Sequence, residues 1–302
     1  MKSSTATTCE LTCLRDGRQR PKGFSLLELL VVLAVIGMLM TISLSVMTKV
    51  RRHMNSVLGA NNQKQIVAGA TLYAFDNHGR YPESVATVGF GSMWNWSEPT
   101  KLVGNEKRSP GMHRSVSEYL REYIADADVM FCRNAPQKYK YLHEAWAAGD
   151  AWDNPETPFP TDPVGGTYCL YWNYIGFLEE RDYPFRGPHT IADGRKYSDL
   201  LVSDYFGYDH WRSPEAFGSC EQFKSARIVP ETWLLSAYWS TDSQNKVSLG
   251  IPLRAGYTDG HVGSFDAAET VTMRVSITSD GTVPYPVGVG PGFFFLPQDC
   301  LR

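Results

Sequence analysis

Three residues near the start of the chain, Gly23, Phe24 and Glu28, have types and spacing suited to chemistry. Gly23 ends a basic leader, Phe24 follows it, and Glu28 is a lone acid within an apolar run. Cleavage after the small residue would free an amino group on Phe24. A carboxylate in a membrane segment costs a few kcal/mol unless it is paired, and the Phe24 α-ammonium of a neighbouring copy fits as its partner. Alternatively, Glu28 lies at the membrane interface and reaches water.

A second group of polar residues belongs to the C-terminal half of the chain. Turns could bring its carboxylates together as a Ca²⁺ site, with Asp204 and Asp259 as the metal ligands. The spacing does not fit an EF-hand, and aspartates that only accept backbone hydrogen bonds in turns explain the same residues. A histidine beside a carboxylate could also act as a base. The members are Asp199, Asp204, Asp209, His210, Asp259 and His261.

The leader, residues 1–23, differs from an ordinary secretory signal in the order of its parts. It contains five basic and two acidic residues and has no apolar core. An ordinary signal places the apolar stretch before the small residue that is cut, whereas here Gly23 comes first. Cleavage at Gly23 would therefore leave the apolar helix on the mature protein. An uncleaved signal-anchor helix remains the alternative.

The apolar run is long enough to cross a membrane. Residues 29–47 have no charge and no proline, and at about 1.5 Å per residue they extend about 28 Å, close to the hydrocarbon thickness of a bilayer. We place the transmembrane segment at about residues 29–48, because Lys49, Arg51 and Arg52 follow it. The distribution of basic residues weakly favours a cytoplasmic N-terminus and a periplasmic head.

The segment Lys22-Gly23-Phe24-Ser25-Leu26-Leu27-Glu28-Leu29 resembles the prepilin N-terminal cleavage and methylation motif. This motif belongs to type IV pilins and to type II secretion pseudopilins. The resemblance implies that a prepilin peptidase of the inner membrane cuts between Gly23 and Phe24 and methylates the new amine. It also implies that Glu28 aligns each copy with itself and with other pilin-like subunits in a filament.

The helical pattern continues beyond the membrane. Apolar residues recur near a 3.6-residue period, which predicts a helix over residues 24–79 with Gly79 as its C-terminal cap. This long helix is the arrangement of the pilin family. Tyr81-Pro82 resembles the segment after the helix in many pseudopilins and favours a secretion-type subunit. The apolar positions are Val57, Leu58, Ile66, Val67, Ala70, Leu72, Tyr73 and Phe75.

Residues 80–302 are numerous enough for one large extracytoplasmic domain. We predict an α+β fold in which the long N-terminal helix packs on a C-terminal antiparallel sheet with long loops. Asp259-Gly260 and Asp280-Gly281 predict turns between strands, and residues 115–125 predict a short helix. The predicted strands are residues 167–172, 232–237 and 270–277.

The size of this domain resembles the large prepilin-like proteins of planctomycete- and lentisphaera-type bacteria. Their C-terminal signature is a His, a spacer and then Asp-Gly. Residues 257–265 look like its Asp-Gly-His-Val end, through Asp259, Gly260 and His261. The upstream His is replaced, because the position ten residues before Asp259 is Leu249.

Four cysteines remain after leader removal, and they suggest two disulfides in a domain outside the cytoplasm. Buried free thiols are the alternative, because the spacings are wide. The candidates are Cys132, Cys169, Cys220 and Cys300.

The net charge of the chain is −3, and removal of a leader with a net charge of +3 leaves about −6. An acidic head does not favour nucleic-acid binding. No motif of a hydrolase or a phosphate-binding loop is present, so we expect a structural subunit and not an enzyme.

The second hypothesis is a membrane-tethered protein that binds a glycan or Ca²⁺, or an enzyme, with the helix serving only as an anchor. Exposed aromatic residues such as Trp94, Trp96 and the segment 205–211 would bind the glycan.

Overall fold

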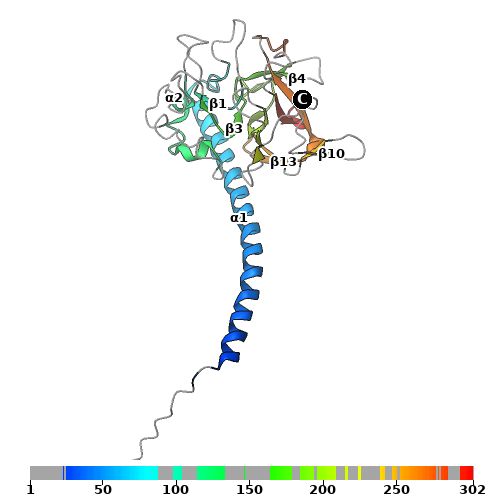
Figure 1. Cartoon of the computed structure of the whole chain (residues 1–302). Coiled ribbons are helices and arrows are strands. Elements are labelled where there is room, and N and C mark those ends of the chain that lie inside the picture. The colour runs from blue at the N-terminus through cyan, green and yellow to red at the C-terminus, as the bar shows by residue number, and fades with distance from the viewer. Residues whose placement is uncertain are drawn as a thin grey trace, which may run out of the picture. The chain divides into compact units, whose positions relative to one another are not determined.

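The computed structural model describes part of the chain, shown in colour in Figure 1. These residues are 23, 25–87, 98–103, 114–132, 146, 164–178, 184–193, 196–208, 215–216, 224–225, 239–241, 247–249, 252–276, 278, 280–284 and 293–301. The chain divides into two compact units, residues 1–49 and 50–302. The predicted α+β fold is confirmed, because one long apolar helix precedes antiparallel sheets.

Helix α1 spans Leu26–Asp76, within the predicted range of 24–79. It ends where His78 and Gly79 take positive φ angles of 56° and 78°, and the Gly79 N–H donates to the Ala74 carbonyl at 2.7 Å. This six-to-one hydrogen bond closes the last turn with His78 in the left-handed position that usually carries glycine. The prediction of a stop here is correct, but the capping residue is His78, with Gly79 next to it.

The elements of the head follow in short segments, and most strands have five residues or fewer. The helical elements are α2 (Val116–Leu120), η1 (Ala127–Met130), η4 (Ala267–Glu269) and η5 (Gln298–Cys300). The strands of the first half are β1 (Lys101–Val103), β2 (Val164–Gly165), β3 (Tyr168–Leu170), β4 (Ile175–Leu178), β5 (Phe185–Arg186), β6 (Leu200–Asp204), β7 (Phe206–Tyr208) and β8 (Glu215–Ala216). The remaining strands are β9 (Lys224–Ser225), β10 (Trp239–Thr241), β11 (Val247–Leu249), β12 (Leu253–Tyr257), β13 (Val262–Phe265), β14 (Thr270–Val275) and β15 (Phe293–Pro297).

Two sheets organise the head, and every strand pairing within the described residues is antiparallel. One has the order β13-β12-β6-β3 and the other β5-β4-β14-β15-β7-β8-β9. Two-stranded pairs, β1-β2 and β10-β11, complete the set. The predicted strands at residues 167–172 and 270–277 contain β3 and β14, whereas residues 232–237 lie outside the described residues.

The local sequence signals of the head act as expected at three places. Ser115 accepts a hydrogen bond from the Ser117 N–H, and Glu118 accepts from the Ser115 N–H at 2.8 Å, which starts α2 with a capping box. Gly260 has a φ angle of 88° in the turn between β12 and β13. Gly281 likewise has a positive φ of 77°, a conformation that glycine adopts without the steric cost of a Cβ.

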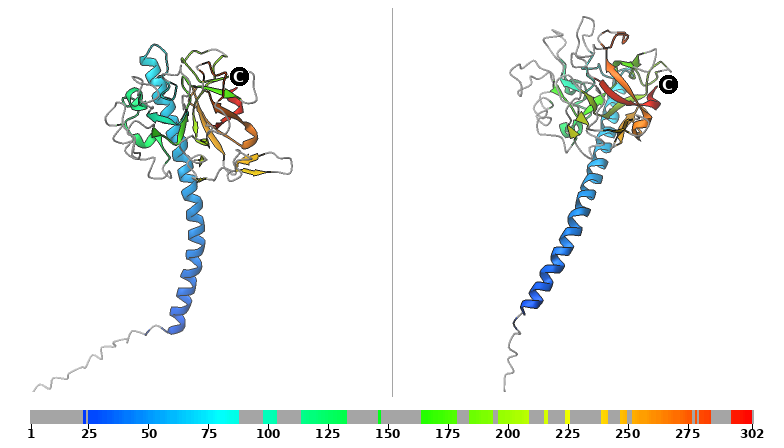
Figure 2. Two further views of the ribbon diagram at one scale, coloured as in Figure 1. Left: turned by 45° about the horizontal axis from the view of Figure 1, so that its top comes forward. Right: turned by 45° about the vertical axis from the view of Figure 1, so that its right-hand side comes forward.

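The second half of α1 is covered by the head along one stripe, as Figure 2 shows for its cyan end. The side chain of Ile124 approaches Gly69 so closely that an added Cβ would lie 2.6 Å from it. On the sheet side, Val67 lies against Gly256 of β12. Glycine at position 69 therefore permits close contact, as its small size suggests. The buried stripe is Asn55, Ser56, Gly59, Gln63, Ile66, Val67, Gly69, Ala70 and Ala74.

This stripe differs from the predicted apolar one. Ile66, Val67 and Ala70 are buried as predicted, but Val57, Leu72 and Phe75 are 53%, 52% and 65% exposed. Small and polar residues take the covered positions of the earlier turns, where Ser56 and Gln63 hydrogen-bond with Arg254 and Asp204. Hydrophobic spacing identified the helix but not the orientation of all its turns.

A buried polar cluster fixes α1 to the sheet. Gln63 Nε2 donates to Asp204 Oδ1 at 2.9 Å, and both side chains are fully buried. The second Asp204 oxygen accepts from the backbone N–H of Arg254 at 2.9 Å. The Arg254 guanidinium in turn donates to the carbonyl and hydroxyl of Ser56. Strand β6, strand β12 and helix α1 are thus joined through one carboxylate.

The cysteine prediction needs correction at two positions. Cys169 on β3 and Cys300 in η5 are free and buried, so the prediction that they form disulfides is wrong. They fill core volume as small apolar side chains, and burial raises the pKa of Cys300 well above its usual value. The backbone N–H of Cys132 donates to Thr167 Oγ1. Cys220 lies outside the described residues, and a disulfide that includes Cys132 or Cys220 stays a prediction.

We expect Asp204→Ala to lower the free energy of unfolding of the head by about 3 kcal/mol, because it leaves the buried donors of Gln63 and Arg254 without their acceptor. Thermal unfolding of the full chain, followed by near-ultraviolet circular dichroism, measures the change. Asp266→Ala is the matched control, since Asp266 is exposed, and surface changes of this kind stay within about 0.5 kcal/mol. Equal melting curves for the two variants would contradict the role of the cluster.

We expect Cys169 and Cys300 not to react with iodoacetamide in the folded chain. Once the chain is unfolded, both should react without any added reductant. Burial excludes the reagent, and the raised pKa of Cys300 keeps its thiol protonated. Peptide mass spectrometry reads the label at each position. The matched control is the same unfolded sample treated with reductant, in which the labelling of these two cysteines does not increase. Labelling that requires reductant would show that they are disulfide-bonded after all.

Candidate functional site: the N-terminal segment

The beginning of α1 is organised by Ser25 and Glu28. The Ser25 N–H donates to Glu28 Oε2 at 2.9 Å, and the Glu28 N–H donates to Ser25 Oγ at 3.2 Å. These two hydrogen bonds form a capping box, the reciprocal pattern of a Ser followed three residues later by a Glu. Sequence reasoning considered Glu28 as an assembly residue or as an acid at the membrane interface, although the Ser25-Leu26-Leu27-Glu28 pattern was available to indicate the cap.

The processing residues lie directly before this cap. Gly23 is exposed, and no atom lies within 4 Å of the position that a Cβ would occupy there. Phe24 lies outside the described residues. The helix therefore begins two residues after the peptide bond that is predicted to be cut.

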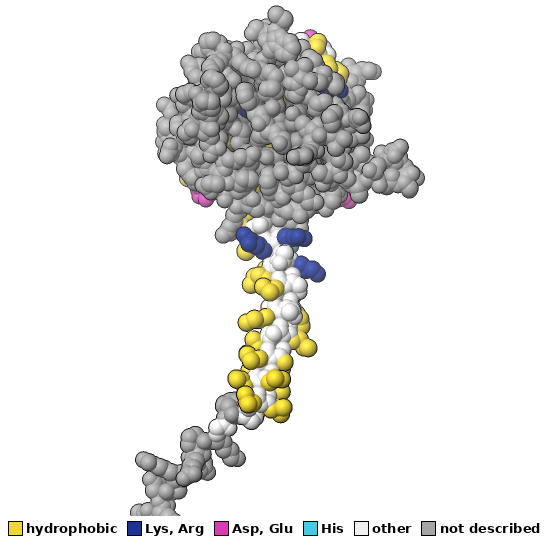
Figure 3. All heavy atoms as spheres, in the orientation of Figure 1, with side chains coloured by type: hydrophobic (Ala, Val, Ile, Leu, Met, Phe, Trp, Pro, Cys, Tyr) yellow, Lys and Arg dark blue, Asp and Glu magenta, His cyan; other side chains and the backbone are white. Residues whose placement is uncertain are grey.

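The first part of α1 has the properties of a membrane anchor. Every described residue of this unit is exposed, including Leu26 at 87% and Met38 at 70%. Such exposure of continuous apolar surface to water would be unfavourable, so it indicates a lipid or protein surrounding. Within the described residues, α1 is the one helix long and apolar enough to span a membrane. Figure 3 shows its hydrophobic side chains in yellow, followed by a group of basic side chains.

The short polar side chains of this segment do not need external partners. The hydroxyls of Thr41 and Ser45 each donate to the carbonyl three residues earlier, both at 2.8 Å. Thr48 donates to the Leu44 carbonyl at 3.1 Å. Because these donors are satisfied within the helix, they can enter an apolar medium at low cost. Glu28 is the remaining polar side chain of the helix start, and its charge is what distinguishes it from these hydroxyls.

The predicted calcium ligands do not lie together. Asp204 ends β6 and contacts the beginning of β12, whereas Asp259 follows the end of β12 in the exposed turn to β13. The four residues of β12 between these two places separate them by more than 10 Å at about 3.4 Å per residue. The prediction of one site containing both is therefore corrected. Among the described residues, no group of three His, Cys, Asp or Glu side chains is arranged to hold a metal ion.

Asp259 and His261 instead stabilise their turn. Asp259 Oδ1 accepts from the His261 N–H at 3.0 Å and contacts its ring nitrogen at 2.5 Å. These contacts, the backbone one first, lower the pKa of Asp259. The His261 ring stacks on Tyr257 at a centroid distance of 4.3 Å. This is the turn chemistry that was considered as the alternative to a metal site.

The other members of the polar group are divided among different places. The carbonyl of Asp199 accepts from the Thr258 N–H at 2.9 Å, so Asp199 lies beside the turn that carries Asp259. Asp209 and His210 lie outside the described residues, as do Trp94, Trp96 and Trp211 of the predicted glycan surface. Tyr205 is fully buried beside Phe294 and is a core residue.

Comparisons with known proteins return one match. Residues 18–44 match the family model described as the prokaryotic N-terminal methylation motif. No curated protein and no solved structure matches the chain. The matched range contains Gly23, Phe24, Ser25 and Glu28 and most of the apolar segment. This motif at the start of a long apolar helix supports the interpretation of the chain as a prepilin-like protein.

Proposed function

We propose that the protein is a structural subunit, processed after Gly23 and assembled through α1 into a pseudopilus or pilus-like filament. The observation that carries this proposal is the methylation motif at residues 18–44, with the acid Glu28 at the start of an exposed apolar helix. A helix that served only as an anchor could begin with the same capping box through an uncharged glutamine, so the cap does not require a charge that costs a few kcal/mol in lipid. An assembly contact accounts for it.

In this proposal the unprocessed chain is a single-pass protein of the inner membrane with a cytoplasmic N-terminus and a periplasmic head. Prepilin peptidase is its first partner, and copies of itself and other pilin-like subunits are the next. Tyr81-Pro82 after the helix supports a type II secretion role. The role is structural and not catalytic, and the acidic head is not expected to bind nucleic acid.

The assembly contact follows from the charges at the helix start. Cleavage leaves an ammonium group on Phe24, and a Glu28 carboxylate exposed on a neighbouring helix offers it an acceptor. In an apolar medium each of these charges is stabilised mainly by the other, so pairing favours one stagger between adjacent helices. The apolar residues after Glu28 then supply the packing surface, from Leu29 onward.

We expect cleavage in a host with active prepilin peptidase to produce a chain that begins at Phe24 and carries one methyl group on its amine. Mass spectrometry of the N-terminal peptide measures this directly. Gly23→Val should stop cleavage, because a β-branched side chain does not fit a site selected for a residue without Cβ. Gly17→Val in the same leader is the control and should leave cleavage unchanged. An intact leader on the wild-type chain would refute the processing step.

We expect Glu28→Gln to leave the chain inserted and processed but to reduce its incorporation into filaments at least tenfold. The glutamine keeps the size of the side chain and a cap acceptor for the Ser25 N–H, yet it removes the charge that pairs with an ammonium group. The fraction of subunit in sheared filaments, relative to that in membranes, gives the measurement.

Ser25→Ala is the matched control for this experiment. It removes the hydroxyl half of the capping box and keeps the carboxylate. If Glu28 serves only to start the helix, Glu28→Gln should be incorporated normally, because glutamine keeps the cap, and Ser25→Ala should be the variant that loses incorporation. Loss confined to Glu28→Gln supports the assembly contact, and normal incorporation of Glu28→Gln would contradict it.

A further inference from the structure

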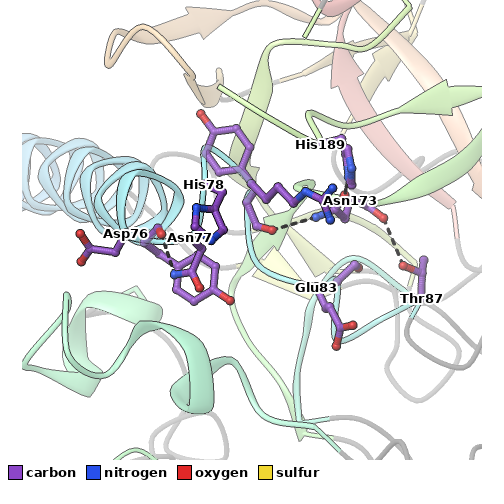
Figure 4. A pocket seen from close by; sticks show the side chains of 11 residues that line it. Asp76, Asn77, His78, Glu83, Thr87, Asn173 and His189 are labelled. Atoms are coloured by element: carbon purple, nitrogen blue, oxygen red, sulfur yellow. Dashed lines mark hydrogen bonds between the residues drawn. The ribbon is translucent and has the colours of Figure 1, made fainter. Parts of the chain in front are cut away.

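A cavity of about 540 Å³ lies where α1 ends and the chain turns back across the head. All of its lining residues belong to the unit 50–302. They come from the last turn of α1, from the segment that follows it, and from the loops on either side of β4 and β5, as Figure 4 shows. Its volume is within the usual range of about 300–1,000 Å³ for small-molecule sites.

The backbone at this cavity is held in unusual conformations. Among the described residues, the two non-glycine residues with positive φ are His78 at 56° and Asn173 at 53°, and both line the cavity. Such conformations are uncommon and concentrate at sites that position side chains for binding. At His78 this conformation also closes α1, so Asn173 is the lining residue whose positive φ the helix end does not explain.

Asn173 determines the orientation of His189. The Asn173 amide nitrogen donates to the carbonyls of Tyr81 and Pro82, at 3.1 and 2.6 Å. Its oxygen must therefore accept from His189 Nδ1, at 2.5 Å. This places a proton on Nδ1, and Nε2 is the ring nitrogen that Asn173 does not contact. Stacking on Tyr197 holds the ring in place, with a centroid distance of 6.3 Å.

The aromatic wall of the cavity is also held firmly. Tyr73 makes edge-to-face contacts with Tyr119 and Tyr123, at centroid distances of 6.0 and 5.9 Å. The hydroxyls of the same two tyrosines donate to Glu83 and Asp76, at 2.9 Å each. Each of these contacts uses one carboxylate oxygen, so Asp76 and Glu83 retain a second oxygen as an acceptor. The contacts fix an apolar ring beside two carboxylates.

The charged groups at the cavity are the second oxygens of Asp76 and Glu83, which accept, and the guanidinium of Arg80, which donates. Histidine and serine side chains add further polar groups to the lining. Two carboxylates and one guanidinium give these charged side chains a sum of −1. An anionic ligand is disfavoured by this charge. A ligand rich in hydroxyl groups fits, because hydroxyls donate to carboxylates and accept from arginine, and its C–H faces can lie on Tyr73.

We propose that this cavity binds a neutral saccharide of about two sugar rings. The residues that would bind its hydroxyl groups are Asp76, Arg80, Glu83 and His189, with Tyr73 as the ring platform. The site differs from the aromatic surface predicted from the sequence, and it does not depend on filament assembly. A filament subunit with such a site would present a glycan-binding surface in each copy.

The test applies saturation-transfer difference NMR to the full chain. The chain is kept in a detergent that has no sugar headgroup. The probes are the neutral disaccharides maltose, cellobiose, lactose and chitobiose, with glucuronate as the anionic comparison and a lysine peptide as the cationic one. We expect transfer to the ring protons of at least one disaccharide and none to glucuronate. Absence of transfer to all four disaccharides would overturn the proposal, and so would transfer to the lysine peptide alone.

Two variants assign the signal to the cavity. We expect Arg80→Ala and Glu83→Gln each to reduce the saccharide signal at least fivefold, and both side chains are exposed, so the fold should be retained. Asp266→Asn is the matched control, an exposed carboxylate on the segment between β13 and β14. Circular dichroism melts of all three should match the wild type. A signal that persists in both cavity variants, or one that the control loses as well, would overturn the assignment.

Discussion

Helix α1 has to satisfy two different surroundings with one continuous run of backbone hydrogen bonds. The first part has exposed apolar side chains at nearly every position, and the second part has a covered stripe that is largely small and polar. The backbone hydrogen bonds of a helix form within the helix in either medium, so only the side chains need to change. Leu29 and Met38 suit lipid or the core of an assembly, whereas Ser56 and Gln63 suit a close contact with a sheet. The fold of the head depends on this second contact.

The polar character of the second contact has a physical reason. Gly69 lets the α1 backbone come so close to Ile124 that an added side chain would collide with it, and the covered positions of the earlier turns are small or polar. Gln63 fills its place and meets Asp204, and two buried polar groups that are joined specify one register between helix and sheet. A purely apolar stripe would stabilise the contact without selecting its position along the helix.

The sequence predicted those features that depend on local spacing. The apolar run, the stop after Asp76, the capping box of α2 and the Asp-Gly turn at Gly260 all follow from residues close together in the chain. Features that depend on distant residues were missed or wrong. Nothing near Asp204 in the sequence indicates that its partner is Gln63, and free cysteines differ from paired ones only through the fold. The cavity combines residues near 76, 173 and 189, which sequence spacing could not bring together.

The capping role of Glu28 and its assembly role are compatible, because a carboxylate has two oxygens and about four acceptor positions. The cap occupies Oε2 through the Ser25 N–H, and Oε1 remains for a partner on another chain. Before cleavage the backbone nitrogen of Phe24 is a peptide N–H, whereas cleavage converts it into a charged amine. Removal of the leader thus changes what this end of the helix can offer a neighbour without changing the cap that starts the helix. Under the proposed function, the charge on the new amine, and not a rearranged helix, would distinguish the subunit that assembles from its precursor.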